Sequence, residues 1–128
     1  MAELISAPTR IPVPGGKVID EYVGRVTTGT DSVSVAHMVA PAGWLEPAQT
    51  PAFDEITVVM RGLVKVDVHG ADGGAETIEV CAGQALVTRA GERIRYSTGD
   101  AETEYVAVCL PAFSPETVNR DEEPDADA

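Results

Sequence analysis

Hydrophobic and polar residues alternate over short stretches of this chain, and the spacing typical of helices is almost absent. Segment 63–69 shows the pattern most clearly, because three valines alternate there with Lys65, Asp67 and His69. Such alternation places successive side chains on opposite faces of a β-strand. The pattern predicts an all-β fold with strands at 18–26, 32–39, 55–60, 63–69, 76–80, 84–88, 94–98 and 105–110, and a hairpin loop at 70–74.

Short strands at this close spacing are typical of a sandwich or a barrel. Two of the runs, ITVVM and EYVAVCL, are hydrophobic on both faces, which predicts a second buried surface. We expect another copy of the chain to cover it, giving a homodimer. The chain is therefore divided into an N-terminal arm and edge strand (1–31), a barrel (32–110) and a C-terminal extension with an acidic, mobile tail (111–128).

Charge and hydropathy narrow the classes of partner. The net charge is -12, and only nine basic residues are scattered along 128 positions. A nucleic-acid-binding protein needs clustered Lys and Arg to neutralise phosphates, so no nucleic-acid partner is expected. No hydrophobic run reaches the roughly 20 residues of a membrane helix, so no membrane partner is expected. The N-terminal segment has no basic cap before a hydrophobic block, which favours the cytoplasm.

Two sets of glycines carry a more specific signal. Gly43 and Gly62 enclose the segment GWLEPAQTPAFDEITVVMRG, with Glu55 at a fixed place between them, and Gly83 and Gly91 bound a second set. In this spacing the chain resembles the cupins over residues 33–110. The resemblance implies a double-stranded β-helix, a jelly-roll-like barrel. It does not assign an activity, because cupins include enzymes, storage proteins and sensor domains.

The resemblance also implies metal ligands that this sequence has replaced. Gln49 and Pro51 stand at the two histidine positions of the first motif, and Ile94 and Thr98 stand at the histidine and asparagine positions of the second. Only Glu55 is kept. Because one carboxylate and one amide do not hold a transition metal against water, we expect no metal and no other cofactor. More loosely, the chain is similar to the ethanolamine-utilisation cupins, which also lack the usual histidines.

Three residues are the candidates for chemistry. Glu55 is expected inside a hydrophobic barrel, where desolvation raises the pKa of a carboxyl group toward the range of a general base. His37 shares a face of its strand with valines, so we expect it to point inward. There it either makes a hydrogen bond within the core or acts as a general acid or base. Tyr96 is expected on the cavity side, where it would orient a substrate oxygen. In a purely structural alternative, Gln49, Tyr96 or an arginine of the barrel anchors Glu55 and no chemistry follows.

The remaining candidates are expected to bind the ligand. Trp44 and Phe53 flank the altered motif, and aromatic groups at a cavity mouth suit a hydrophobic or ring-containing small molecule. As an alternative, the two rings cap the end of the barrel. The full set of expected ligand-binding residues is Gln49, Trp44, Phe53, Pro51, Ile94 and Thr98.

These features lead to three hypotheses of function. The first is a metal-independent enzyme that acts on a small organic molecule by proton transfer, as an isomerase, cyclase or dehydratase, with Glu55 as base. The second is a module without catalytic activity that binds a small ligand or serves as a structural subunit. The third is a residual metalloenzyme that uses His37 and Glu55.

Overall fold

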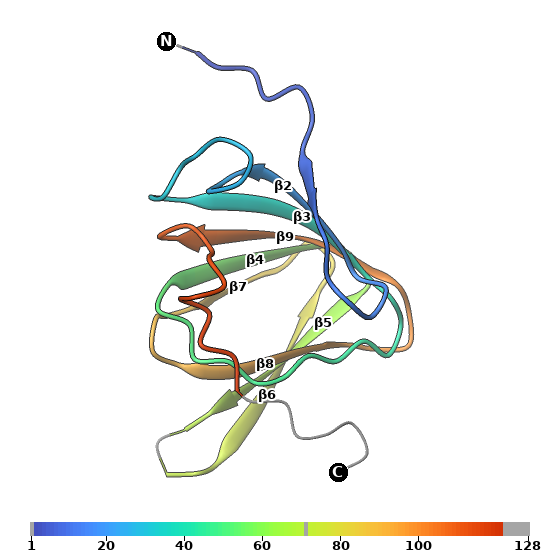
Figure 1. The fold of residues 1–128 in the computed structure, drawn as a ribbon. Coiled ribbons are helices and arrows are strands. Elements are labelled where there is room, and N and C mark those ends of the chain that lie inside the picture. Colours follow the sequence, from blue (N-terminus) through green and yellow to red (C-terminus); the bar gives the residue numbers. More distant parts are fainter. Residues whose placement is uncertain (1, 71, 122–128) are drawn as a thin grey trace.

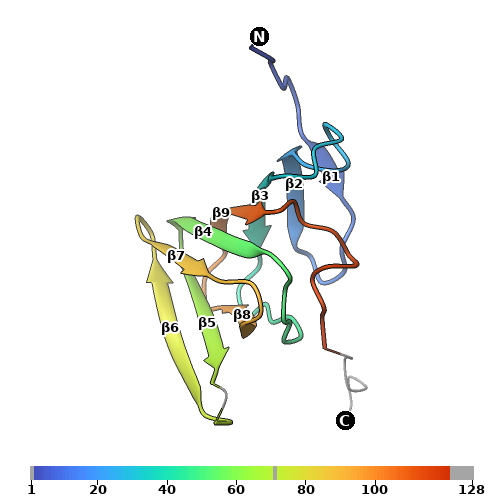
Figure 2. The same cartoon turned by 90° about the vertical axis from the view of Figure 1, so that its left-hand side faces the viewer.

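The chain folds into two antiparallel sheets that face each other. The computed structural model describes residues 2–70 and 72–121, and no helix in this part is long and hydrophobic enough to cross a membrane. One sheet has the order β1 (Thr9–Ile11), β2 (Val18–Val23), β3 (Ser34–Ala40), β9 (Thr103–Leu110), β4 (Asp54–Arg61) and β7 (Ala85–Thr88). The other has the order β6 (Ala75–Cys81), β5 (Leu63–His69) and β8 (Arg93–Thr98) (Figure 1; Figure 2).

The predicted all-β class is confirmed, and each predicted strand has a counterpart in the sheets. The edge strand expected at 18–26 ends at Val23, because a loop begins at Gly24. The carbonyl of Gly24 accepts hydrogen bonds from the amides of Thr28 and Thr30 within this loop. The sequence pattern did not predict β1, since three residues are too few to show alternation. Residue 71 of the expected hairpin loop and residues 122–128 of the expected acidic tail lie outside the described residues.

The inward face of β3 is the opposite of the expected one. Ser34 and Ala36 are buried in the barrel, whereas His37 is one-third exposed and pairs with Glu104 of β9 on the outer face, at 2.6 Å from Nε2 to Oε2. The expectation that His37 points into the barrel is therefore wrong. Both faces of this strand carry small or hydrophobic side chains, so the alternation alone did not distinguish inside from outside.

Large side chains fill one end of the barrel. Val64 and Val66 of β5 point inward and meet Ile94 and Tyr96 of β8, and all four are almost fully buried. Val59 of β4 and Tyr105 of β9 close the same cluster from the six-stranded sheet. Their burial supplies the hydrophobic free energy that joins the two sheets.

Small and polar side chains occupy the inward positions toward the other end. The strand register puts Ala36, Ala107 and Thr57 in one row across β3, β9 and β4. The next row holds Ser34, Cys109 and Glu55. Residues in one row share a face of the sheet. Most side chains in these two rows are small, and they leave a cavity between the large sheet and the segments that cover it.

The segment after β9 folds back over this end of the barrel. Ala112 and Val118 are buried, and Phe113 packs edge-on against Phe53 with ring centroids 5.9 Å apart. The amide of Thr50 donates to the carbonyl of Asn119, and the amide of Ala52 donates to the carbonyl of Thr117. These hydrogen bonds fix the segment, which is the red loop after β9 in Figure 1. Residues 111–121 thus form part of the packed structure.

Gly62 connects β4 to β5 at a point where the backbones are very close. Its φ is +85°, and an added Cβ would lie 2.8 Å from the carbonyl oxygen of Glu102 and would also collide with Thr103. The Thr103 hydroxyl is held there by hydrogen bonds to the amide and carbonyl of Leu63. Any side chain at this position would therefore push β9 away from the turn.

Gly62→Ala is predicted to destabilise the protein much more than Gly83→Ala. Both glycines have a positive φ, but an added Cβ at Gly83 meets nothing within 4 Å. The control therefore carries only the conformational cost of roughly 1–2 kcal/mol, and Gly62→Ala adds a steric term of roughly 1–3 kcal/mol. Denaturant unfolding measures both values, and equal losses for the two variants would contradict the close approach.

Candidate ligand-binding site

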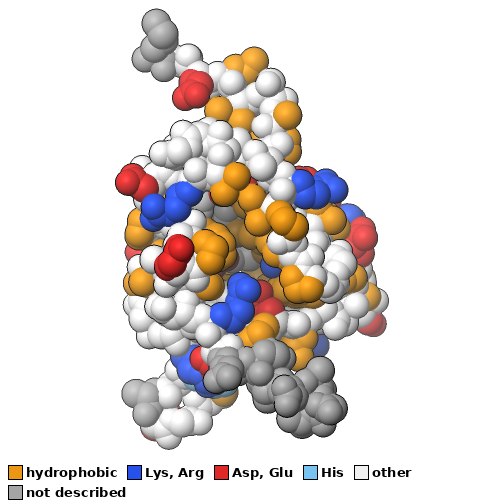
Figure 3. Space-filling model, viewed as in Figure 1, with side chains coloured by type: hydrophobic (Ala, Val, Ile, Leu, Met, Phe, Trp, Pro, Cys, Tyr) orange, Lys and Arg blue, Asp and Glu red, His pale blue; other side chains and the backbone are white. Residues whose placement is uncertain are grey.

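A cavity of about 520 Å³ lies at the end of the barrel where the inward side chains are small. Ala36, Ala107 and Cys109 form its floor, and Phe53 and Phe113 close one side. Residues 11–19 of the N-terminal arm close the other side. In Figure 3 the molecule is hollowed on this face, and hydrophobic side chains surround the hollow with basic and acidic side chains beside them. The volume is in the range of small-molecule sites.

Segment 44–50 runs along the free edge of β8 and brings polar groups to the cavity. The amide of Gln49 donates to the carbonyl of Ile94 at 2.8 Å, and the amide of Ile94 donates back at 2.8 Å. Glu46 donates its amide to the carbonyl of Tyr96. This pairing fixes the side chains of Glu46 and Gln49 at the cavity wall.

Lys17 lies on the opposite wall of the cavity, contributed by the arm before β2. Its ammonium nitrogen is 4.0 Å from the ring centroid of Trp44 and 5.4 Å from that of Tyr105. Burial lowers the pKa of Lys17, while the carboxylates of Glu46 and Glu55 act in the other direction. The two aromatic faces attract the charged form and hold it inside the cavity.

Glu46 and Gln49 both meet Arg120 from the C-terminal segment. The Nη2 atom of Arg120 is 3.9 Å from Oε2 of Glu46 and 3.4 Å from Oε1 of Gln49. The Glu46 side chain is only 12% exposed, and burial raises its pKa against the effect of Lys17 and Arg120. Arg120 itself is 43% exposed, so it stands at the opening of the cavity.

Glu55 is the most deeply placed ionisable group of the site. It is 8% exposed, and burial raises its pKa to about 7, with the neighbouring carboxylate of Glu46 adding to the rise. Lys17, the Tyr96 hydroxyl and Arg120 lower the pKa in part. Near neutral pH this carboxyl group is therefore present in both protonation states.

The structure brings five of the predicted site residues together around the cavity. They are Glu55, Tyr96, Gln49, Trp44 and Phe53. The Tyr96 hydroxyl lies 3.4 Å from that of Thr88, and burial raises its pKa well above the ordinary value. The inward positions of Glu55 and Tyr96 follow the predicted alternation of their strands, whereas the other three lie on the segment between β3 and β4. The roles assigned to all five remain predictions.

Four predicted residues do not line this cavity. His37 lies on the outer face of β3, and Pro51 is buried away from the cavity beside Gly91, whose amide donates to its carbonyl. Ile94 packs into the hydrophobic cluster at the filled end. Pro51 and Ile94 were assigned from the cupin motif, and their side chains are part of the packed structure. His37 was assigned from the face of its strand, and it is turned outward.

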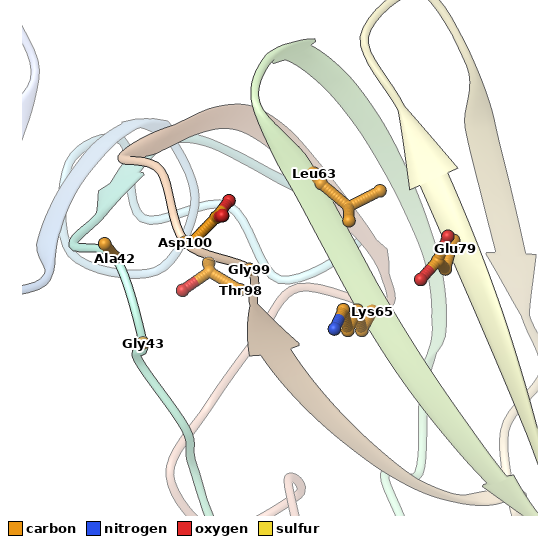
Figure 4. Close-up of a pocket in the computed structure, with 8 residues that line it drawn as sticks. All are labelled: Ala42, Gly43, Leu63, Lys65, Glu79, Thr98, Gly99 and Asp100. Atoms are coloured by element: carbon orange, nitrogen blue, oxygen red, sulfur yellow. The ribbon is translucent and has the colours of Figure 1, made fainter.

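Thr98 has a structural role at a different place. Its hydroxyl donates to the carbonyl of Pro41 at 2.7 Å and accepts from the amide of Trp44 at 2.9 Å. It borders a shallow depression beyond the end of β8, together with Lys65 and Glu79 of the small sheet (Figure 4). This depression is broad but largely open to solvent, so the more enclosed cavity at the barrel end is the stronger candidate for a ligand site.

The donor set at the cupin metal position does not fit a transition metal. Within residues 2–70 and 72–121, no three His, Cys, Asp or Glu side chains converge as metal ligands would. Gln49 is turned toward Arg120, and Ile94 offers no donor atom. The cations of Lys17 and Arg120 also act on Glu55. A positively charged surrounding opposes a further cation, so no step of a mechanism is assigned to a metal.

Sequence reasoning missed the charged groups that surround Glu55. Lys17, Glu46 and Arg120 come from the arm, the loop before β4 and the C-terminal segment. None of them lies on a strand, so periodicity gave no information about their direction. A usable signal was present at Lys17, because it is one of only two lysines in the chain.

The architecture and the position of the site define the class of the protein. The chain has the fold of the cupin superfamily. Oxalate decarboxylase from Bacillus subtilis at pH 4.6, a cupin, superposes with a TM-score of 0.78 at 15% identity, over 91% of this chain and 31% of that chain. A tryptophan-to-tyrosine variant of that enzyme gives the same values, and this likeness establishes the fold alone.

At the level of sequence, no family model matches the chain. The chain is 44% identical over 107 residues to a protein of Myxococcus xanthus (strain DK1622) named Endoribonuclease YbeY. The match spans 83% of this chain and 35% of that protein, so the chain covers about a third of its relative.

This relationship corrects the first hypothesis of function. The expected metal-independent isomerase, cyclase or dehydratase is wrong, because the curated relative is named as an endoribonuclease, which is none of these. The cupin resemblance suggested small-molecule chemistry from the barrel and its retained carboxylate. The resemblance contained no information on the longer Myxococcus xanthus protein, of which only about a third matches this chain.

The buried carboxyl of Glu55 is predicted to make stability depend on pH in a specific window. Its folded-state pKa of about 7 lies above the ordinary value of 4.5, so the folded protein keeps the proton that the unfolded chain releases. The free energy of unfolding therefore falls as pH rises from 4.5 to about 7 and is level above that. The full loss is on the order of 3 kcal/mol.

Denaturant unfolding of the wild type and Glu55→Gln across this window measures the effect. The difference between the two proteins should change over that range and be constant at higher pH. Parallel curves at all pH values would show that the carboxyl has an ordinary pKa and is solvated.

Proposed function

We propose that this chain is a cupin domain that binds a small organic molecule and acts beside an RNA-processing activity without being the nuclease. The observation that carries the proposal is the partly enclosed cavity of about 520 Å³, with ionisable groups at one side and hydrophobic groups at the other. This arrangement suits a small amphiphilic ligand. Glu55, Tyr96, Gln49, Trp44 and Phe53 are the proposed binding residues.

The division of the cavity supports an amphiphilic ligand. Hydrophobic side chains of Ile11, Ile19 and Met38 lie in one strand-register row, which continues through Tyr105 to Val59. Lys17 and Glu55 stand where this surface meets the loop that carries Glu46. A ligand with a hydrophobic body and a polar head could satisfy both parts, whereas a purely polar ligand would leave the first unused.

The relation to the endoribonuclease supports a role next to RNA chemistry. The aligned part is about a third of that protein, which leaves most of its length without a counterpart in this chain. The net charge of -12 opposes contact between this domain and phosphate groups. We therefore assign ligand binding to the cupin part and place any nuclease activity outside it.

A second copy of the chain is the proposed partner of the outer face of the large sheet. Ile56 and Val58 of β4 and Val106 and Val108 of β9 lie side by side on this face, and none of them is fully buried. Met60, Val87 and Leu110 extend the surface and are exposed. Pairing of this surface with its own copy would remove it from water.

Ligand binding can be tested with the fluorescence of Trp44, the only tryptophan of the chain. We expect a screen of short-chain and ring-containing acids, alcohols and amines to reveal compounds that change this fluorescence and raise the melting temperature. Ala107→Leu should fill the cavity floor and weaken their binding by about ten-fold or more. Val106→Leu places the same final side chain on the outer face of the same strand and should leave ligand binding unchanged.

Two results would contradict this proposal. One is a screen in which no compound changes either signal. The other is equal binding by Ala107→Leu and the wild type, with folding of the variant confirmed by circular dichroism, since the ligand would then lie elsewhere.

The purified chain is predicted neither to cleave RNA nor to retain it at physiological salt. The physical reason is the electrostatic repulsion between an acidic domain and the phosphate backbone. Incubation with a labelled single-stranded RNA, followed by gel electrophoresis and a filter-binding assay, measures both properties. Cleavage that co-purifies with the chain would place the nuclease activity in this domain and overturn the assignment.

A further inference from the structure

The surroundings of Lys17 indicate which class of ligand the cavity binds. This inference rests on the proposed binding function. In the part of the chain that the structure describes, no carboxylate oxygen lies within 4.0 Å of its ammonium, and no side chain or carbonyl accepts a hydrogen bond from it. Its close contacts are the faces of Trp44 and Tyr105. A half-buried ammonium whose close contacts are aromatic rings keeps its hydrogen-bond donors free for another partner.

The charges around the cavity favour an anionic partner. Lys17 and Arg120 each contribute one positive charge, and Glu46, which approaches Arg120, contributes one negative charge. Glu21 also lines the cavity, where its carboxylate accepts hydrogen bonds from the amides of Val26 and Thr27. Without Glu21, the groups around Lys17 have a net charge of about +1 when Glu55 is protonated and are neutral when Glu55 is ionised. When Glu55 is protonated, the positive charge around Lys17 balances the charge of a monoanion. The same positive charge repels a cation, and it is too small to balance a dianion.

We propose that the cavity binds an organic monocarboxylate with a hydrophobic body, that the carboxylate head lies at Lys17 on the Arg120 side, and that Glu55 takes up one proton when the ligand binds. The head accepts hydrogen bonds from the Lys17 ammonium. In the structure Glu46 does not do this, because its carboxylate pairs with Arg120 and no oxygen of it lies within 4.0 Å of the ammonium. The body lies against Phe53, Ala107 and Met38 on the cavity floor.

Proton uptake follows from the groups that face Glu55. Glu46 comes from the loop, Lys17 from the arm, Tyr96 from β8 and Arg120 from the C-terminal segment. The thiol of Cys109 from β9 also faces it and is kept neutral, because burial raises its pKa. An incoming carboxylate adds negative charge to a place that already contains Glu46, and this favours the protonated form of Glu55 further. Binding is therefore strongest where Glu55 is protonated and weakens as pH rises through about 7.

The test uses three probes of the same size and different charge: phenylacetate, 2-phenylethanol and 2-phenylethylamine. We expect phenylacetate to bind most tightly in a titration followed by calorimetry and Trp44 fluorescence. Its affinity should fall about ten-fold between about pH 6 and about pH 8, with a proton taken up on binding. Phenylacetate stays ionised over this range, so the change reports on the protein.

Variants separate the head-group contact from the proton site. Lys17→Met should reduce the affinity for phenylacetate to that for 2-phenylethanol, while Lys65→Met, at the only other lysine, should have no effect. Glu55→Gln should remove the pH dependence of phenylacetate affinity between about pH 6 and about pH 8. The melting temperature of each variant without ligand shows that it is folded.

The outcomes distinguish this inference from the proposed function. Equal or tighter binding of the alcohol or the amine, or phenylacetate binding that is independent of pH in the wild type, overturns the inference and leaves a small-molecule site. The inference is also overturned, and the small-molecule site kept, if compounds from the broader screen bind and none of them is an anion. If no compound of either set binds, both the inference and the proposed function are overturned.

Discussion

The gradient of side-chain size along the three central strands determines what this barrel can do. β9 is hydrogen-bonded between β3 and β4, at the centre of the large sheet. The size of its inward side chains therefore determines how much space remains between the two sheets. Toward one end the inward positions are Tyr105 and Val59, and the two sheets pack tightly there. Toward the other end they are Ala107, Thr57 and Glu55, which leave a space that the small sheet does not fill. Core and cavity are thus two ends of the same strands.

The gradient also explains why segments outside the barrel are essential to the site. An open end lined by small groups would expose hydrophobic surface to water, and the arm, the loop at 44–50 and the segment after β9 cover it. Each covering segment contributes one charged group, namely Lys17, Glu46 or Arg120. The charges of the cavity therefore depend on the docking of these segments, and loosening any of them would alter the protonation of Glu55.

The sequence predicted the barrel because the signals for it are local. Alternating side chains define strands, and Gly62 is required by a close approach that no other residue permits. The inward position of Glu55 followed from the same logic. The direction of His37 did not, since both faces of β3 are compatible with burial and only the pairing with Glu104 decides it. Lys17 and Arg120 were out of reach because they act through tertiary contacts between segments far apart in the chain.

The energetic cost of the cavity charges indicates that they form a site. Transferring Glu55 and Lys17 from water to a hydrophobic interior is unfavourable, and Lys17 recovers part of this only through aromatic rings and distant carboxylates. A hydrophobic residue of similar volume at Lys17 would spare the fold that cost and would bury the faces of Trp44 and Tyr105 equally well. A barrel selected for stability alone would gain from this exchange. Groups that weaken the fold and share one cavity are most simply explained by a ligand that completes their charge balance.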